Sequence, residues 1–278
     1  MLKFDKELAL RIITGFALSL VGALLVYFSS YPYVINIPVA LLCIGSIYEL
    51  YKAAGFNRKY FIVLILFWIG SLAISFLKIP YYSYIVMVLY PFIIAFFLLL
   101  MIKKDRFVKF ARQRSLLIPS SIVVLLFHSL IDIRQLEFGF YYLIFAILDC
   151  VFTDIFAYLC GKTFGKHKMF PSISPKKTWE GSIGGSTSAV ILLLLIFAIL
   201  TIKTDISVNF PLLILYTLIV SAFSQFGDLS MSVIKRICGI KDFGKIFPGH
   251  GGVLDRFDSQ LIAVPLAYIL CSLSGFIM

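Results

Sequence analysis

Long apolar segments recur along the whole chain and leave little room for a water-soluble fold. About 20 consecutive apolar residues cross the hydrocarbon core of a bilayer as a helix, and about nine segments approach that length. They lie near residues 9–29, 33–51, 60–78, 82–102, 115–132, 138–160, 182–203, 210–234 and 259–277. With 61% hydrophobic and only 14% charged residues, the chain is far from the composition of soluble domains. We therefore predict an all-α, polytopic integral membrane protein with about nine transmembrane helices.

The basic residues are distributed unevenly between the loops that join these segments. All but three of the 25 Lys and Arg residues lie at the N-terminus or in the loop after every second segment, the exceptions being Lys78, Arg134 and Lys203. Because cytoplasmic loops are enriched in Lys and Arg, we expect the N-terminus in the cytoplasm and the C-terminus outside. The same rule accounts for the net charge of +11 without a nucleic-acid partner. The expected location is the cell (cytoplasmic) membrane.

The chain is expected to form a single polytopic domain, residues 1–278, with its polar motifs in the second half. We predict that residues 1–135 form a helical scaffold, and that residues 136–278 carry the active site in two cytoplasmic loops. The first apolar segment lacks a clear cleavage site and is interpreted as a membrane anchor rather than a signal peptide. The five cysteines show no metal-ligand spacing and are expected to be reduced packing residues.

Four acidic residues fall within or at the ends of predicted membrane segments: Glu49, Asp149, Asp154 and Asp228. An ionisable group at membrane depth costs on the order of 3 kcal/mol, so each is a candidate functional residue. For the first three, a structural and a functional role both stay open. Asp228 is favoured as functional, because Ser232 and Lys235 follow it by one and two helical turns and share its face.

The segment 232–258, SVIKRICGIKDFGKIFPGHGGVLDRFD, adds two further carboxylates close to a predicted helix start. Asp255 and Asp258 are three residues apart and would share one face of a first helical turn. Together with Asp228 they form an oxygen-donor set that suits Mg²⁺, with room for a second cation. Asp258 could also cap the following helix; the two roles are compatible, and the metal role is favoured.

The glycines of the same segment indicate a phosphate-binding loop. Gly249, Gly251 and Gly252 surround His250, and glycines allow backbone N–H groups to approach a phosphate closely. His250 is interpreted as a phosphate ligand, although a lone histidine is more often structural.

The other charged loop, residues 161–181, contains the compact sequence SPKKTWEG. Loop orientation alone would explain its lysines. It would not explain why Lys176 and Lys177 stand between Pro175 and Trp179, an arrangement in which a rigid turn presents two point charges for phosphate. Trp179 is a candidate for stacking on a base.

The segment 232–258 resembles the motif of phosphatidate cytidylyltransferases (CDP-diacylglycerol synthases). That motif reads S-x-apolar-K-R, four residues, K-D, and then P-x-H-G-G-apolar-x-D-R-x-D. The matching positions are Ser232, Lys235, Arg236, Lys241, Asp242, Pro248, His250, Gly251, Gly252, Asp255, Arg256 and Asp258. The upstream sequence D-x-x-A-Y…G-K-x-x-G-K…I-S-P-K-K-T-W-E-G and the Gly227–Asp228 pair are similar to the same family. The first half of the chain resembles it only in hydropathy.

The resemblance implies an enzyme of phospholipid biosynthesis that transfers the cytidylyl group of CTP to phosphatidate, with release of pyrophosphate. Its implied partners are CTP, phosphatidate, membrane lipid and a second copy of the chain in a homodimer. The implied catalytic residues are Asp228, Asp255, Lys235, Arg236 and Arg256. Mg²⁺ would be held by Asp228, Asp255 and Asp258. Substrate binding would fall to Lys176, Lys177, Ser232, Lys241, His250, Gly251 and Gly252.

Two other functions are compatible with the sequence. One is a related CTP-dependent enzyme that acts on another lipid phosphate or on a polyprenol. The other is a secondary transporter whose intramembrane acids couple ions, a function that would leave the clustered motif of the second half unexplained.

Overall fold

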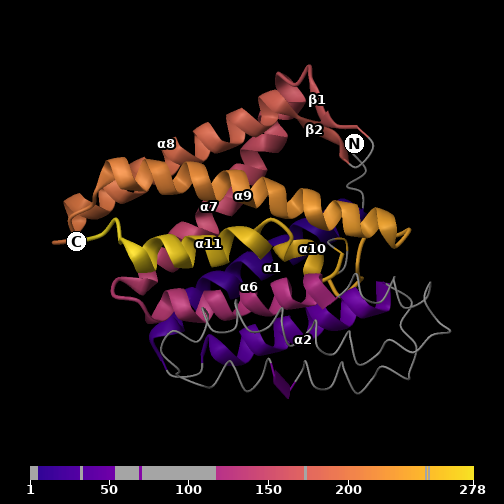
Figure 1. The fold of residues 1–278 in the computed structure, drawn as a ribbon, viewed down its shortest axis with the longest axis horizontal. Helices are drawn as coiled ribbons and strands as arrows, with labels where there is room; N and C mark the ends of the chain where they lie inside the picture. Colours follow the sequence, from indigo (N-terminus) through magenta and orange to yellow (C-terminus); the bar gives the residue numbers. More distant parts are fainter. Residues whose placement is uncertain are drawn as a thin grey trace, which may run out of the picture. The chain divides into compact units, whose positions relative to one another are not determined.

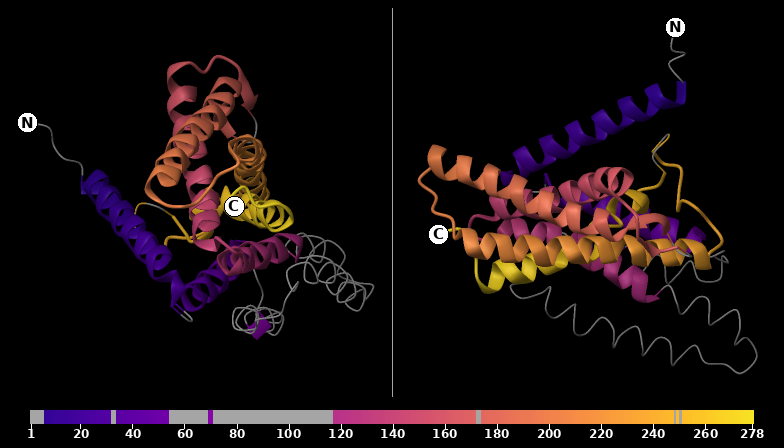
Figure 2. Two further views of the ribbon diagram at one scale, coloured as in Figure 1. Left: turned by 90° about the vertical axis from the view of Figure 1, so that its left-hand side faces the viewer. Right: turned by 90° about the horizontal axis from the view of Figure 1, so that it is seen from above.

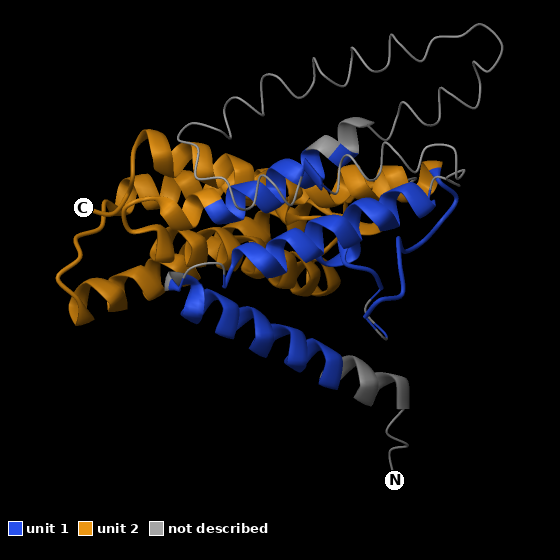
Figure 3. Ribbon diagram, turned by 90° about the horizontal axis from the view of Figure 1, so that it is seen from below, with its two compact units in different colours: residues 1–131, 238–257 blue, residues 132–237, 258–278 orange. Residues whose placement is uncertain are grey.

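The computed structural model describes residues 6–31, 34–53, 69–70, 117–171, 174–247, 249 and 251–278. In this part of the chain the regular structure is helical, apart from one short β-hairpin (Figure 1). The chain falls into two compact units (Figure 3). Unit 1 comprises Met1–Ile131 and Cys238–Phe257, and unit 2 comprises Asp132–Ile237 and Asp258–Met278. The loop 238–257 thus groups with the N-terminal residues, and the predicted single domain with a scaffold of residues 1–135 stays a prediction.

Unit 2 is built from four apolar helices: α7 (Gly139–Thr163), α8 (Trp179–Lys203), α9 (Phe210–Ile237) and α11 (Gln260–Leu273). Among the described residues, α7, α8 and α9 are long and apolar enough to cross a membrane. They coincide with the predicted segments 138–160, 182–203 and 210–234. Helix α7 packs against α8, α9 and α11, and α9 packs against both α8 and α11 (Figures 1 and 2). A mostly helical membrane protein is thereby confirmed, whereas the number of spans and the orientation stay predictions.

Glycines allow the close packing of α7 and α8. A Cβ atom at Gly185 would lie 2.7 Å from the carbonyl oxygen of Thr153 and 2.9 Å from Cβ of Ala157. One helical turn earlier, a Cβ atom at Gly181 would lie 2.6 Å from the carbonyl oxygen of Ala157. Small residues at such contacts are how helices associate where lipid offers no hydrophobic gain. This contact fixes the start of α8, and with it the hairpin that precedes α8.

The hairpin joins α7 to α8 and was not expected from the sequence. Strands β1 (Lys168–Phe170) and β2 (Ser174–Thr178) are antiparallel, with Lys168 opposite Thr178. The Thr178 hydroxyl caps α8 by accepting a hydrogen bond from the Gly181 N–H at 3.1 Å. The Glu180 carboxylate accepts hydrogen bonds from the backbone of Lys166 and contacts Nδ1 of His167 at 2.6 Å. The hairpin is therefore tied to the first turn of α8.

Unit 1 contains helices α1 (Lys6–Tyr27), α2 (Asn36–Ala53), the start of α6 (Leu117–Gln135) and the short helices η1 (Phe28–Ser30) and α10 (Leu254–Phe257). Helices α1, α2 and α6 occupy the predicted segments 9–29, 33–51 and 115–132. Within the loop 238–257, helix α10 packs against α2. The ring centroids of Phe127 and Phe257 lie 5.2 Å apart. The predicted segments 60–78 and 82–102 lie outside the described residues, apart from residues 69–70.

Candidate active site

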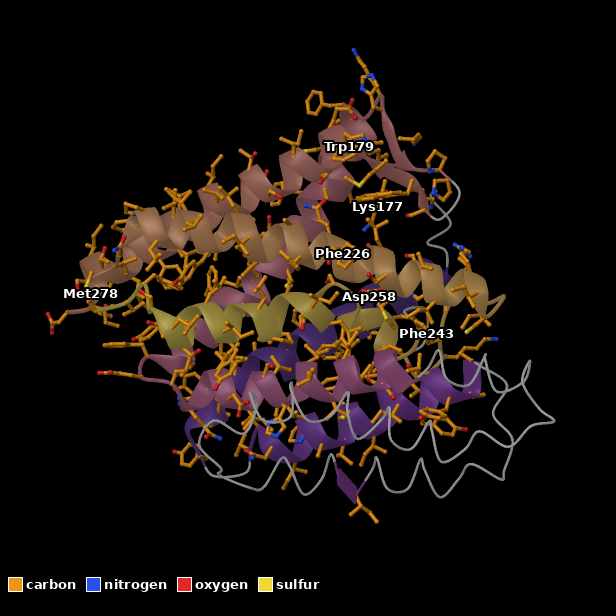
Figure 4. All side chains as sticks on the ribbon, in the orientation of Figure 1. Lys177, Trp179, Phe226, Phe243, Asp258 and Met278 are labelled. Atoms are coloured by element: carbon orange, nitrogen blue, oxygen red, sulfur yellow. The ribbon has the colours of Figure 1, made fainter. Side chains whose placement is uncertain are left out.

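A first lysine–aspartate pair in unit 2 joins the hairpin to α9. The Nζ atom of Lys177, near the end of β2, lies 2.7 Å from Oδ2 of Asp228 and donates to the carbonyl oxygen of Gln225 at 3.2 Å. Both side chains are partly buried. In Figure 4, Lys177 extends from the hairpin towards the part of α9 that carries Phe226. Two predicted site residues, one in the loop 161–181 and the other in the segment 210–234, are thus in direct contact.

A second pair joins α9 to the residue that precedes α11. Nζ of Lys235 lies 3.3 Å from Oδ2 of Asp258, and the two side chains are only 12% and 18% exposed. Gly227 makes this approach feasible, because a Cβ atom there would lie 2.8 Å from the carbonyl oxygen of Asp258. Oδ1 of Asp258 accepts a hydrogen bond from the N–H of Ser259 at 3.1 Å. The carboxylate therefore contacts both a lysine and the backbone at the start of α11.

Asp154 on α7 adds a third carboxylate to these pairs. It interacts with the charges of Asp228 and Lys177 and with the Ser259 side chain, and its own charge acts on Asp258. Asp154 and Asp228 each stand nine residues before the end of their helix. The sequence left its role open, and the signal that marks it is the D-x-x-A-Y similarity upstream.

The electrostatics of this cluster favour a bound cation. Burial raises the pKa of Asp258 to about 7, the neighbouring Asp228 carboxylate adds to the rise, and Lys235 opposes it. When all three carboxylates are ionised, the two ammonium groups leave one negative charge unbalanced. A divalent cation would offset this charge, and carboxylate oxygens are donors that Mg²⁺ prefers.

The described side chains are not arranged as a metal site, although their chemistry suits a cation. Within the described residues, no group of three or more His, Cys, Asp or Glu side chains is arranged closely enough to hold a metal ion. In their place, Lys177 and Lys235 contact the Asp228 and Asp258 carboxylates directly. The donor types fit Mg²⁺, and the magnesium site stays a prediction.

Asp255 takes part in the loop of unit 1. Its Oδ2 atom accepts hydrogen bonds from the backbone N–H groups of Phe243 and Gly252, both at 2.9 Å, and the residue is 5% exposed. The carboxylate therefore holds the two sides of the loop together. No contact with a metal is needed to explain its burial, and its predicted metal and catalytic roles stay untested.

The glycine-rich turn of this loop is closed by a backbone bridge. Phe247 and Gly251 exchange two N–H···O hydrogen bonds of 2.9 and 3.1 Å, and Gly251 has a φ of 90° that favours glycine. His250, predicted as a phosphate ligand, lies outside the described residues.

Four cations predicted to be catalytic or to bind substrate have exposed side chains. They are Lys176 on β2, Arg236 near the end of α9, Lys241 in the loop and Arg256 on α10. Ser232 on α9 is half-buried. Exposure leaves these four charges accessible to a soluble anion. The predicted catalytic roles of Arg236 and Arg256 and the predicted substrate-binding roles of Lys176 and Lys241 stay predictions.

Comparison with known proteins identifies the family of this chain. A family model described as the cytidylyltransferase family matches residues 9–274. The chain belongs to this family. The match extends through the first half, where the sequence resembles phosphatidate cytidylyltransferases only in hydropathy.

The relatives named phosphatidate cytidylyltransferase include proteins of three bacterial species. The Staphylococcus haemolyticus protein is 47% identical over 132 residues, which are 48% of this chain and 49% of the relative. The Bacillus subtilis protein is 43% identical over 148 residues, 53% and 54% of the two chains. The Staphylococcus aureus (strain COL) protein is 48% identical over 132 residues, 48% and 49% of the two chains. The match thus spans about half the length of these curated relatives.

In this cytidylyltransferase-family chain, the two remaining membrane acids have different surroundings from the cluster. Asp149 on α7 is fully buried and accepts a hydrogen bond from the Thr153 hydroxyl one turn later, at 3.3 Å. Glu49 on α2 is also buried and accepts two backbone hydrogen bonds from the loop of unit 1. Its own helix offered no sign of these partners, which lie more than two hundred residues away along the chain.

Proposed function

We propose that this chain transfers the cytidylyl group of CTP to phosphatidate, forming CDP-diacylglycerol and pyrophosphate. Membership of the cytidylyltransferase family supports this, as does the name shared by relatives 43–48% identical to half of the chain. The observation that carries the proposal is the pairing of Lys177 with Asp228 and of Lys235 with Asp258. The first contact joins the upstream motif to the Gly227–Asp228 pair, and the second joins the two ends of the segment 232–258.

The reaction requires little covalent chemistry from the protein. An oxygen of the phosphatidate phosphate forms a bond to the α-phosphorus of CTP, and the bond from that phosphorus to the bridging oxygen of the β-phosphate breaks. Pyrophosphate leaves with the electron pair. The lipid phosphate is already ionised near neutral pH, so no general base is required. Catalysis must mainly overcome the repulsion between two anions, through positioning and electrostatic stabilisation.

The cluster in unit 2 would supply these effects. Asp228 and Asp258, with Asp154 beside them, would hold Mg²⁺, which neutralises phosphate oxygens and activates the electrophile when it is bound. Lys177 and Lys235 hold the carboxylates in place, and their ammonium groups can also meet phosphate oxygens. The exposed Lys176 and Arg236 of this unit would bind the outer phosphates of CTP. Lys241 and Arg256, in the loop of unit 1, are proposed as further cationic ligands of the substrate.

A soluble nucleotide and a membrane lipid must meet at one site. The distribution of Lys and Arg supports placing the ends of α7 and α9 at the cytoplasmic face of the cell membrane, where CTP is available. Asp154 and Asp228 would then lie about 13 Å inside the ends of their helices, at 1.5 Å per residue. A homodimer remains part of the proposal as an expected assembly.

The choice of acceptor tests this function against its closest rival. The purified full-length chain is supplied with CTP and Mg²⁺ and with phosphatidate, a polyprenyl phosphate or a polyprenol, and the extracted lipids are identified by mass spectrometry. We expect CDP-diacylglycerol from phosphatidate, at least about tenfold faster than any product from the other acceptors. Faster turnover of a polyprenyl acceptor would contradict the proposal. Ion flux into sealed vesicles without nucleotide turnover would indicate a transporter instead.

A further inference from the structure

Glu49 is a buried acid that the proposed reaction does not use. It lies on α2, in the half of the chain that the motif resemblance does not reach, and is 2% exposed. Its Oε1 atom accepts a hydrogen bond from the N–H of Val253 at 3.1 Å, and Oε2 accepts one from the N–H of Leu254 at 3.0 Å. The Glu49 carboxylate therefore binds the backbone of the glycine-rich loop.

The two N–H groups belong to the start of α10, where they need outside partners. The first N–H groups of a helix have no acceptor within the helix, and a buried carboxylate is costly unless it is hydrogen-bonded. One contact satisfies both requirements. Because Leu254 begins α10 and Arg256 lies on the same short helix, the contact at Leu254 also positions Arg256.

The loop is shaped around this carboxylate. A Cβ atom at Gly244 or at Gly252 would overlap the Glu49 carboxylate, so only glycine leaves room for it. One turn earlier on α2, Gly45 faces Val253, where a Cβ atom would lie 3.5 Å from Cγ2. Asp255 binds the N–H groups of Phe243 and Gly252, so two carboxylates together hold four backbone N–H groups of the loop.

We propose that Glu49 is a positioning residue for the substrate-binding loop, acting through the backbone of Val253 and Leu254. The proposal deepens the cytidylyltransferase function and, for its kinetic part, rests on it. Glu49 itself contacts no substrate. It fixes the loop that carries Gly251, Gly252 and Arg256, so its loss weakens binding of the nucleotide.

The test compares Glu49→Gln with Glu137→Gln, a matched change at an exposed acid of unit 2. Glutamine offers one acceptor oxygen, while its NH₂ group faces the second backbone N–H, and the negative charge is gone. The first readout is limited trypsin digestion of the detergent-solubilised full chain. Cleavage of the loop after Lys245 is followed through the fragment that begins at Ile246. Cleavage after Lys203, the last residue of α8 in unit 2, serves as the internal reference. The second readout is KM for CTP and kcat with phosphatidate.

We expect Glu49→Gln to accelerate cleavage after Lys245 by about tenfold or more, because a hydrogen bond to a charged acceptor is lost. Cleavage after Lys203 should be unchanged, and Glu137→Gln should match the wild type at both sites. KM for CTP should rise about tenfold, with a smaller change in kcat. A purely structural role would instead reduce the active fraction, and hence apparent kcat, at constant KM.

Gly244→Ala provides a second approach to the same contact, because its methyl group would displace the carboxylate from the loop side. It should also favour cleavage after Lys245 over cleavage after Lys203, whether or not Glu49→Gln can be purified. Wild-type cleavage and wild-type KM in Glu49→Gln would overturn the inference, as would equal acceleration at both cleavage sites. An inactive wild-type chain would refute the proposed function alone, since the digestion measures the loop independently of turnover.

Discussion

Asp228→Asn is expected to lower CDP-diacylglycerol synthesis by at least about a thousandfold, because the substitution removes charge from the centre of the cluster at nearly constant shape. Asp228 contacts Lys177 at 2.7 Å and acts electrostatically on both Asp154 and Asp258. It is also the carboxylate that Lys177 contacts directly. The measurement is the initial rate of lipid product formation from CTP and phosphatidate at saturating Mg²⁺.

Asp205→Asn is the matched control for this experiment. Asp205 is an exposed acid in the connection between α8 and α9 of the same unit, and we expect its variant to retain the wild-type rate within about twofold. Both variants should show the same thermal unfolding midpoint within a few degrees. A folded Asp228→Asn protein with more than a tenth of wild-type activity would exclude Asp228 from the site.

Lys177→Ala is expected to reduce the rate at least about a hundredfold, whereas Lys176→Ala should reduce it less than about threefold. The neighbouring lysines have the same charge and adjacent positions on β2, but different surroundings. Lys177 is partly buried and contacts Asp228 and the carbonyl oxygen of Gln225, while the Lys176 side chain is exposed. Removing Lys177 would leave the Asp228 carboxylate without its closest cation.

The pair of variants is informative because it separates charge from position. Initial rates at increasing CTP distinguish loss of binding from loss of turnover. Lys177→Arg, which keeps the charge in a wider group, should recover part of the activity lost in Lys177→Ala. Equal losses in Lys176→Ala and Lys177→Ala would contradict the site geometry and would favour two equivalent phosphate ligands, as the sequence alone suggests.

Much of the helical architecture could be predicted from the sequence. A segment of about 20 apolar residues has few alternatives to a membrane helix, and α7, α8 and α9 lie where the apolar segments predict them. The hairpin between α7 and α8 was missed. Its strands have only three and five residues, Pro175 lies in the second strand, and the contacts of Glu180 with Lys166 and His167 that tie it down are not local in sequence.

The site was predictable where its residues share one helix, and not where they come from distant parts of the chain. Asp228 and Lys235 share a helix face, so their spacing indicated the site directly. The sequence does not decide between a structural and a functional role for Asp154, because helical periodicity does not say which face of α7 meets α9. The role of Glu49 could not be predicted either, because its partners, Val253 and Leu254, are 204 and 205 residues away in sequence. Asp255 matches the motif as well as Asp258 does, and only the structure shows Asp255 bonded to loop N–H groups.

The position of a label in CTP tests the central claim most directly. The purified chain is incubated with phosphatidate, Mg²⁺ and CTP that carries radioactive phosphorus at either the α or the γ position, and radioactivity is measured in the lipid and aqueous phases. Cytidylyl transfer predicts that the α label enters the lipid in a one-to-one ratio with CTP consumed, and that the γ label leaves as pyrophosphate. A γ label in the lipid would show phosphoryl transfer instead, and would contradict the account.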